Sequence, residues 1–507
     1  MIQYKKIFNS ITVLILIFYI HGSVESHARE LINLSLESAV DIAMKNSYRI
    51  KQLELGIKET RYWLKSERAA LKSKVYMNLI SPEFDSVSDS KWNSTLGINE
   101  IVRQNTRRWQ MDLSVKQPVI VLGHPTNGYL SLNNKVYRYL QKENGMEDVD
   151  YYNRFFIEYE QPFFRPNELK NDIENAELNV KREELGYIRD RVNFANNISY
   201  EFYTLYELVD RSMIYSRYIE ELEEIYDIAH SSALQDTTQK IDEIRARVEL
   251  TNARELLMKN LSALRLQKLN MKQRLRLNVQ DSLMVEHTVS LKPINVDFEQ
   301  ALQYGYTLRP HIRLLNIEKR RREIVLDNAH GWDSFHMELE ITLGFEKNDD
   351  MYSALWDKYS NSYSVSLNAY IPIWDWGQQK SRLEAQRMFV KQADLNIEEN
   401  LDSIKSSLST TLTNLEDYQQ RALNLQKSVT LAQEISDLSI QQYRNNKISL
   451  HGVLQIVDKQ RETELNFLDA YLGYRRTLES LKSLTYYDYE ENVSLLEKFR
   501  PVSSGNS

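Results

Sequence analysis

Two segments of eleven residues, 335–345 and 363–373, alternate strictly: every odd position is apolar, and the even positions are mostly polar. Such alternation gives a strand with one apolar and one polar face. Eleven residues is also about the length of a tilted strand that crosses a bilayer, ~9–11. A half-buried soluble sheet alternates in the same way, but its strands are usually nearer 5–6 residues. We therefore predict antiparallel transmembrane β-barrel strands, with Leu339 and Ile341 facing lipid.

A different period runs through 378–444, which contains neither proline nor glycine. Leu401, Leu408 and Leu415 recur every seven residues, and a second apolar row follows three positions later. This spacing is an a/d seam of period 3.5, typical of long helices that pack side by side. The polar run Asn445-Asn446-Lys447 indicates a reversal, so the pattern predicts a long helical hairpin over 378–485.

The chain contains two copies of one unit. A shift of 262 residues aligns 36–40 with 298–302, and a shift of 210 aligns 160–163 with 370–373. Both alignments continue without gaps over long spans. Two short matches with different shifts are explained by one duplication, in which the first copy is longer than the second.

The first repeat is expected to cover 27–290 and the second 291–507. Each would contain a first helix, a strand region and a long helical hairpin, which in the first repeat spans 167–280. The first helix of the second repeat is expected at 298–330. Ser35 and Asp297 are expected to be N-caps, because their side-chain oxygens can accept hydrogen bonds from the first helical turn.

The difference between the two shifts places about 52 extra residues in the first repeat, between 80 and 155. Within this segment Trp109, Met111, Leu113 and Val115 alternate with polar residues, as strand residues do. The extra residues form either an additional hairpin, which would give six barrel strands instead of four, or an outer loop. The pattern alone leaves both open.

Residues 1–26 have the organisation of a secretory signal peptide. Lys5 and Lys6 precede an apolar run over 11–20, which is shorter than the ~20 residues that a transmembrane helix needs. Cleavage is expected after Ser26, with Ala28 as a second option. A retained membrane anchor is the alternative interpretation.

Composition narrows the functional classes. The chain has no cysteine, which excludes thiolate metal sites and cysteine nucleophiles. Its 64 basic and 71 acidic residues give a net charge of −7, so there is no electrostatic case for a nucleic-acid partner. The nine histidines show no metal-binding spacing, and neither a glycine-rich phosphate loop nor a Gly-x-Ser-x-Gly motif occurs. We expect no catalytic site, no cofactor and no metal.

The second strand segment ends in Tyr370-Ile371-Pro372-Ile373-Trp374-Asp375-Trp376-Gly377, and Tyr443 precedes Ile448-Ser449-Leu450 and Val453-Leu454 at the reversal. With the duplicated unit, these motifs resemble the TolC-like outer membrane efflux proteins over nearly the whole chain. The resemblance implies a mixed, mainly α fold: helical hairpins that form a periplasmic α-barrel, and β-barrel strands shared in a homotrimer. It also implies an exit duct in outer-membrane lipid that works with a periplasmic adaptor protein and an inner-membrane pump.

The hairpin tip departs from that family's pattern. Asn446 stands where the family usually has glycine, and Gly452 and Gln455 stand where it often has acidic residues. Asp458 lies one turn further on, and Asp242 matches Gly452 in the first repeat. Asp242, Gln455 and Asp458 are therefore the candidates for a pore constriction. The alternative is that they are solvated residues of the helix surface.

Two other functional classes fit parts of the sequence. One is a coiled-coil structural or adhesive envelope protein without a conduit. The other is a soluble exported enzyme or binding protein built on a helical scaffold.

Overall fold

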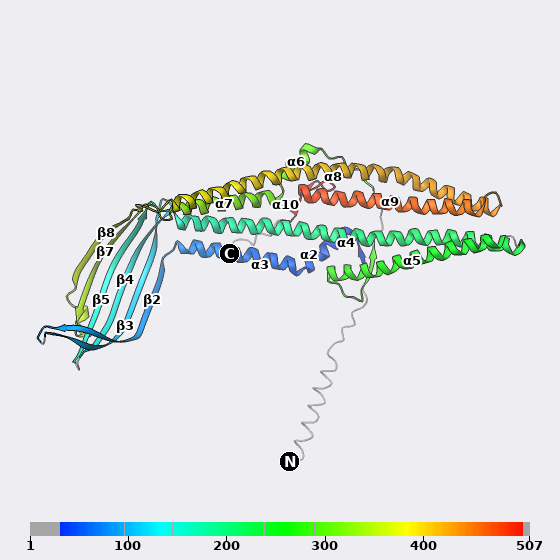
Figure 1. Cartoon of the computed structure of the whole chain (residues 1–507). Helices are drawn as coiled ribbons and strands as arrows, with labels where there is room; N and C mark the ends of the chain where they lie inside the picture. The colour runs from blue at the N-terminus through cyan, green and yellow to red at the C-terminus, as the bar shows by residue number, and fades with distance from the viewer. Residues whose placement is uncertain (1–30, 96, 144–145, 237–238, 287–290, 500–507) are drawn as a thin grey trace, which may run out of the picture. The chain divides into compact units, whose positions relative to one another are not determined.

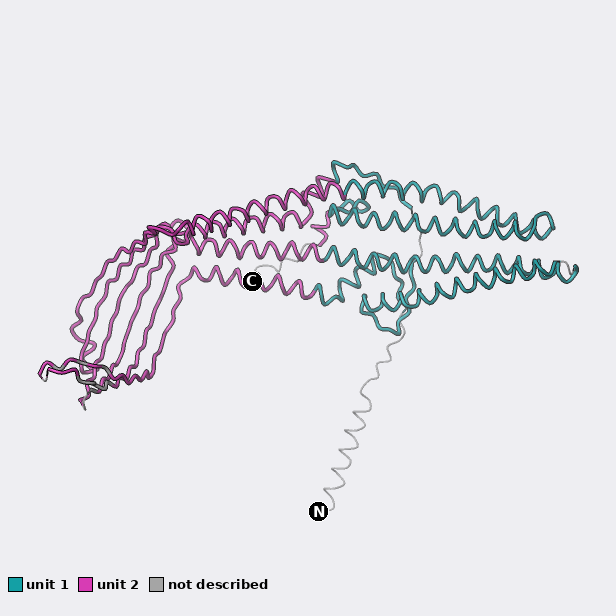
Figure 2. Tube along the Cα trace, viewed as in Figure 1, with its two compact units in different colours: residues 1–50, 191–301, 408–493 teal, residues 51–190, 302–407, 494–507 magenta. Residues whose placement is uncertain are grey.

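The computed structural model describes residues 31–95, 97–143, 146–236, 239–286 and 291–499. The predicted signal peptide lies outside these residues. The chain divides into two compact units, shown in Figure 2, and neither unit follows one repeat. The first consists of Met1–Ile50, Arg191–Ala301 and Leu408–Val493, and the second of Lys51–Asp190, Leu302–Ser407 and Ser494–Ser507. Each unit combines segments from both halves of the sequence.

The second unit contains one antiparallel sheet of six strands in the order β2-β3-β4-β5-β7-β8 (Figure 1). The extra residues of the first half therefore form an additional hairpin, β3–β4, and not an outer loop. The strands are β2 (Lys74–Asn93), β3 (Ile98–Val121), β4 (His124–Glu143), β5 (Met146–Phe163), β7 (His336–Asp349) and β8 (Ser360–Tyr370).

The two predicted strands exist, but their bounds differ from those expected from the alternation. β7 continues four residues beyond 345, where it pairs with β5 as far as Tyr151 opposite Asp349. β8 begins earlier and stops at Tyr370, opposite His336, instead of reaching 373. Pro372 has no N–H to donate to the ladder, so the apolar alternation of 371–373 continues outside the sheet.

Position 344 requires glycine because β5 approaches β7 closely there. Gly344 lies opposite Phe156, and a Cβ at Gly344 would lie 2.7 Å from the Cβ of Phe156 and 2.6 Å from the carbonyl oxygen of Phe155. The backbone of β5 and the Cβ of Phe156 thus occupy the space that a side chain at Gly344 would need. Pairing of an aromatic residue with a glycine is a common way to hold strand register.

Four helical segments follow the sheet in the second unit, in the lateral order α3-α4-α7-α8. Ion pairs join the neighbours: Arg61–Glu184 at 2.8 Å, Arg320–Glu174 at 2.6 Å and Lys319–Asp394 at 2.6 Å. The helices are α3 (Tyr48–Ala70), the first part of α4 (Glu168–Gln235), α7 (Pro310–His330) and the first part of α8 (Gln378–Arg444).

The first helix of each repeat is two helices, not one. The expected helix 298–330 is divided into α6 (Phe298–Thr307) and α7 because Arg309, which precedes Pro310, is extended with ψ 119°. In the first half, α2 (Leu36–Asn46) ends before its extended C-cap Ser47, and α3 follows. The two expected N-caps are present: Ser35 accepts from the Ser38 amide and Asp297 from the Gln300 amide.

The first unit is built from two helical hairpins. The remainder of α4 packs with α5 (Lys240–Leu275), and the remainder of α8 packs with α9 (Leu450–Thr485). A short parallel pair, β1 (Leu31–Leu34) and β6 (Ser282–Val285), joins the core formed around Leu205 and Leu275.

Short elements complete the chain: η2 (Tyr352–Trp356), β9 (Tyr487–Asp488), β10 (Val493–Ser494) and α10 (Leu495–Lys498).

Several positions show how the hairpins are formed. The C-caps of α5 and α9 are Arg276 and Tyr486, both left-handed with φ 55°, and they lie 210 residues apart. Asn446 adopts φ 57° at the reversal, where asparagine replaces the glycine expected there. Gly473 of α9 lies against the ring of Tyr418 of α8, 2.4 Å from where a Cβ would lie. The predicted seam residues Leu408 and Leu415 are buried.

Candidate functional site

The candidate site is the contact between the two hairpins of the first unit, near their turns. Apolar residues of α4, α5, α8 and α9 form one buried cluster there. Asn260 of α5 donates to the Leu208 carbonyl of α4 at 2.8 Å, and Arg211 of α4 pairs with Asp469 of α9 at 2.8 Å. The lateral order of the helices is therefore α5-α4-α9-α8.

Asp242 lies in the first turn of α5 and is half-buried. Tyr443, near the end of α8, is buried in the same cluster. Burial raises the pKa of Tyr443, and the negative charge of Asp242 raises it further. Asp242 is thus close enough to act electrostatically on the opposite hairpin.

Asp458 is exposed on α9 and is already paired within its own helix. Its Oδ1 accepts from Arg461, whose Nε lies 3.2 Å away. The Arg461 guanidinium also lies over the ring of Tyr218, 5.0 Å from its centroid. Burial, followed by the charge of Asp458, raises the pKa of Tyr218 to about 12. Much of the Asp458 charge is therefore compensated locally.

Gln455 is exposed on α9, three residues after Gly452, whose amide donates to the Ser449 N-cap at 3.2 Å. Among the described residues, no hydrogen bond or ion pair joins Gln455, Asp242 and Asp458. One chain places them on two helices with separate neighbours, so a shared constriction would require further copies.

A buried polar network joins α4, α8 and α9, and none of its residues was among the site residues predicted from the sequence. Glu464 of α9 is 5% exposed, and its Oε1 accepts from Arg217 of α4 at 2.5 Å and from Gln433 of α8 at 3.0 Å. Gln460, 3% exposed, donates to Glu221 of α4 at 3.0 Å and to Glu464 at 3.4 Å. The network connects both hairpins through hydrogen bonds to charged groups, which are stronger than neutral ones.

A sequence signal for this network did exist. Val453, Val457, Leu468 and Tyr471 form a buried row on α9 at spacings of three and four, and Gln460 and Glu464 occupy the intervening positions of that row. Two polar residues in an otherwise apolar seam indicate a buried polar contact. Burial raises the pKa of Glu221 to about 7, although the hydrogen bond from Gln460 opposes this change.

A second buried carboxylate lies close to the turn of the first hairpin. Glu243, in the first turn of α5, is 2% exposed. His230 of α4 lies 3.1 Å from it, Arg247 lies 3.3 Å from it, and Lys240 pairs with it as well. The hydrogen bond from Lys240, followed by that from His230, lowers the pKa of Glu243. This cluster fixes the start of α5 against the end of α4.

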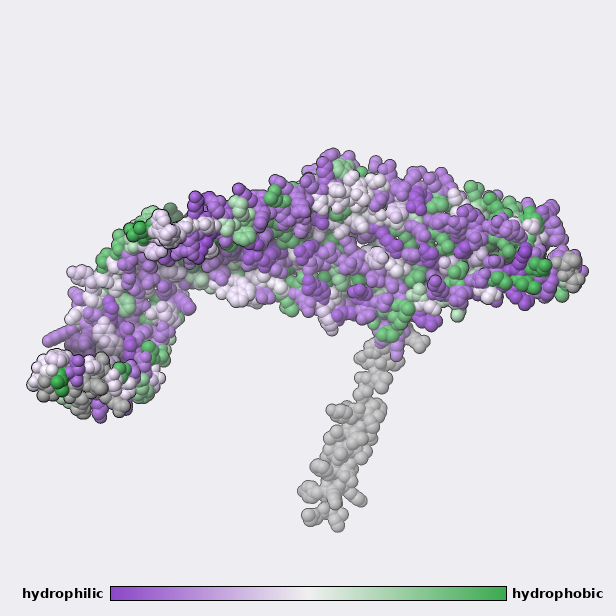
Figure 3. Space-filling view, viewed as in Figure 1, coloured by the Kyte–Doolittle hydropathy of each residue, from purple (hydrophilic) through white to green (hydrophobic). Residues whose placement is uncertain are grey.

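Apolar residues at least half exposed follow the two lateral helices near the hairpin ends. They lie on α5 at Ile241, Ile244 and Val248, and on α8 at Leu431, Ile435 and Leu438. Figure 3 shows hydrophobic surface over the ends of both hairpins. Because α5 and α8 are the outermost helices of the row, these stripes have no partner helix among the described residues of one chain.

Neither metal binding nor a helical membrane anchor is indicated by the described part of the chain. No group of three or more His, Cys, Asp or Glu side chains there is placed to hold a metal ion. Among the helices that the structure describes, none combines the length and the apolar character needed to cross a membrane.

Comparison with solved structures identifies the fold. The chain is similar to CusC, with a TM-score of 0.65, 14% sequence identity and coverage of 91% of this chain and 95% of the other. It is similar to the VceC outer membrane protein of Vibrio cholerae, with a TM-score of 0.63, 10% identity and coverage of 90% and 95%. For the CmeC outer membrane channel of Campylobacter jejuni the TM-score is 0.60, with 14% identity and 95% coverage of both chains.

The chain therefore has the fold of these outer-membrane channels, and the resemblance to the TolC-like family is confirmed for the fold. No family model matches the sequence, and no curated protein does.

Proposed function

We propose that this chain forms the outer-membrane exit duct of a tripartite efflux or secretion system. The observation that carries the proposal is the sheet with one apolar, exposed face. Leu343, Phe345, Val365 and Leu367 are all more than half exposed on that face. An exposed apolar surface of this extent is costly in water and is stable in lipid.

The duct would be a homotrimer, because the sheet and the helices both end in unpartnered edges. β2 and β8 are the edge strands of the sheet, and α5 and α8 are the lateral helices of the first unit. Three copies would pair β8 of one chain with β2 of the next and would bury the apolar stripes of α5 and α8. Six strands from each of three chains give eighteen, and barrels of about 16–18 strands enclose an aqueous channel.

Transport through such a duct would be passive, and the chain would not be an enzyme. Energy would come from an inner-membrane pump, connected through a periplasmic adaptor protein. The helical hairpins would extend into the periplasm, and their ends would open and close the duct. The network around Glu464 would then resist separation of the hairpins.

Single-channel conductance in planar bilayers tests the proposal. The purified full-length chain should form channels of uniform conductance. A coiled-coil structural or adhesive protein would give no channels. The absence of channel conductance would therefore refute the duct. Native mass spectrometry in detergent should give the mass of a trimer, whereas a monomer or dimer would refute the closure of eighteen strands.

Asp242, Gln455 and Asp458 are proposed to line the constriction at the hairpin ends. Because Arg461 compensates Asp458, Asp242 should carry most of the cation preference, and Gln455 should only narrow the opening. The reversal potential under a salt gradient should shift towards lower cation selectivity in Asp242→Asn and less in Asp458→Asn. Wild-type selectivity in both variants would remove these residues from the constriction.

A further inference from the structure

The apolar band on the outward face of the sheet ends at a defined level on the side away from the helices. On β7 it begins at the row of Met337 and Ala369, near the helices, and Lys347, ten residues further along the strand, is the first charged residue of this face. Ten residues at ~3.3 Å each, tilted by roughly 40°, give a height of about 25 Å. This equals the height of the lipid-facing band of outer-membrane barrels, about 25 Å. The row of Asp349 therefore lies at the level of lipid headgroups.

Two arginines on the outward face stand at this level, and neither forms an ion pair with a carboxylate among the described residues. Arg138 shares the row of Tyr151 and Asp349 and lies opposite Trp109 on β3. Its guanidinium is 5.0 Å from the Trp109 ring centroid and 5.8 Å from that of Tyr151. Its Nε is buried without a hydrogen-bond partner.

Arg107 lies two residues before Trp109, on the same face, and is exposed. Its guanidinium lies 5.4 Å from the ring centroid of Phe84, and no ion pair with a described residue compensates it. Asp349, which shares the row of Arg138, pairs with Lys347 at 2.8 Å instead. Neither guanidinium group is therefore neutralised by a carboxylate in the described part of the sheet.

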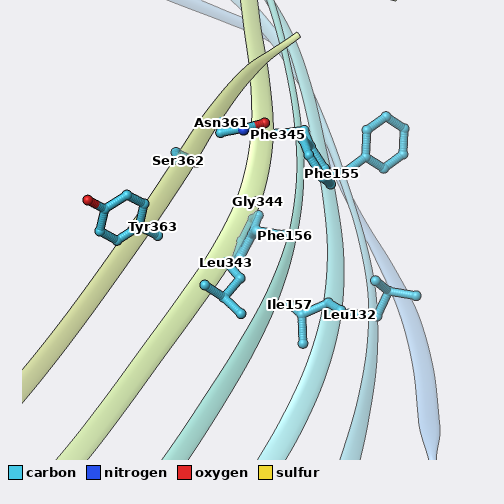
Figure 4. Close-up of a pocket in the computed structure, with 10 residues that line it drawn as sticks. All are labelled: Leu132, Phe155, Phe156, Ile157, Leu343, Gly344, Phe345, Asn361, Ser362 and Tyr363. Atoms are coloured by element: carbon cyan, nitrogen blue, oxygen red, sulfur yellow. The ribbon is translucent and has the colours of Figure 1, made fainter.

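The same face carries an apolar groove of about 380 Å³, whose lining residues are shown in Figure 4. The groove lies closer to the helices than the two arginines do. Its lining comes from β4, β5, β7 and β8 and includes the apolar side chains of Leu132, Phe155, Ile157 and Leu343. Phe155 and Ile157 lie four and six residues from Tyr151 along β5, about 13–20 Å at ~3.3 Å per residue. An acyl chain attached to a headgroup at Arg138 is long enough to reach the groove.

We propose that Arg107 and Arg138 bind the phosphate groups of a phosphorylated lipid of the outer leaflet, with an acyl chain in the groove below. Guanidinium groups bind phosphate through paired N–H donors, and the flanking aromatic rings hold them at the interface. The inference rests on the proposed duct, since only a membrane-spanning sheet would place this face against lipid.

The opposite face of the same sheet provides a matched control. Arg108, next to Arg107, faces inward, donates to Gln110 and lies over the ring of Tyr137. Arg154 also faces inward, where its Nε is 3.7 Å from Glu346. Replacing Arg108 of β3 and Arg154 of β5 removes the same charge from the same sheet but leaves the outward patch on β3 and β4 intact.

The test is native mass spectrometry of the purified full-length chain in detergent, titrated with a bis-phosphorylated glycolipid (lipid A) and with its dephosphorylated form. Arg107→Gln/Arg138→Gln should weaken binding of the phosphorylated lipid by about tenfold or more, while Arg108→Gln/Arg154→Gln should bind as the wild type does. The dephosphorylated lipid should bind all three proteins equally weakly.

Wild-type affinity in the outward double variant would overturn the proposal, and so would an equal loss in the inward one. Displacement of the lipid by the same concentration of inorganic phosphate would show a site for the free ion and would also overturn it. Conductance measured on the same preparations separates the two proposals. Channels without phosphate-dependent lipid binding refute only the lipid site, whereas phosphate-dependent binding without channels refutes only the duct.

Discussion

Glu221→Gln should make the contact between the hairpins less dependent on pH. Glu221 is half-buried on α4 and accepts from Gln460 of α9, so its carboxyl group is part of the network that connects the hairpins. Glutamine keeps the shape of the side chain and an accepting oxygen at the same place. The substitution therefore removes a titratable group and little else.

The magnitude follows from the pKa, which burial raises from 4.5 to about 7. The folded protein then holds the proton to a higher pH than the unfolded chain does. The stabilisation is present below pH 4.5 and is lost as pH rises through 7. At about 1.4 kcal/mol per pH unit this amounts to about 3 kcal/mol. Because Glu221 is only half-buried, solvent screening reduces the expected effect to ~1–2 kcal/mol.

The assay is thermal unfolding of the detergent-solubilised protein between pH 5 and pH 8. The wild type should lose roughly 2–6 °C more in Tm over this range than Glu221→Gln does. Glu220→Gln, an exposed neighbour on the same helix, should follow the wild type. Parallel curves for the wild type and Glu221→Gln would show that the carboxyl group does not titrate in this range, and the reasoning would be refuted.

Three further substitutions, two of them with a control variant, test the sheet and the helical packing. Leu343→Arg, near the middle of the apolar band, should cost about 2–4 kcal/mol and reduce the amount of trimer in outer-membrane fractions, while Ser366→Arg on the opposite face should be tolerated; equal tolerance would contradict the barrel. Gly473→Ala would place a Cβ against the ring of Tyr418 and should lower the free energy of unfolding, measured with denaturant, by ~1–3 kcal/mol. Its control Gly186→Ala, which has open space around it, should raise the free energy of unfolding by ~0.5–1 kcal/mol. Leu408→Ala should cost about 2–5 kcal/mol in the same measurement, and a neutral result would mean that the seam is misplaced.

Much of the local structure could be predicted from the sequence, because periodicity alone decides which positions share a face. The alternation in 335–345 and 363–373 predicted strands with one apolar face, and the heptad spacing at Leu408 and Leu415 predicted buried helical positions. Both patterns depend on residues close together in the chain. The left-handed conformation of Asn446 at the reversal also depends on local sequence, because asparagine tolerates that conformation.

Strand pairing required the tertiary structure. The alternation around Trp109 is compatible with a loop or a hairpin, and only pairing of β3 and β4 with β2 and β5 makes six strands. Register then decides that Arg107 and Arg138 share the outward face while Arg108 faces inward, since a shift of one residue would exchange the faces.

The polar contacts between the hairpins also depended on the tertiary structure. Gln460 and Glu464 interrupt an apolar row in the sequence, but their partners Arg217 and Glu221 lie more than 200 residues away. A periodic pattern shows that such a polar group will be buried. Which group compensates it is decided by the packing of distant helices, because a buried charge is stable only when a partner from elsewhere in the fold reaches it.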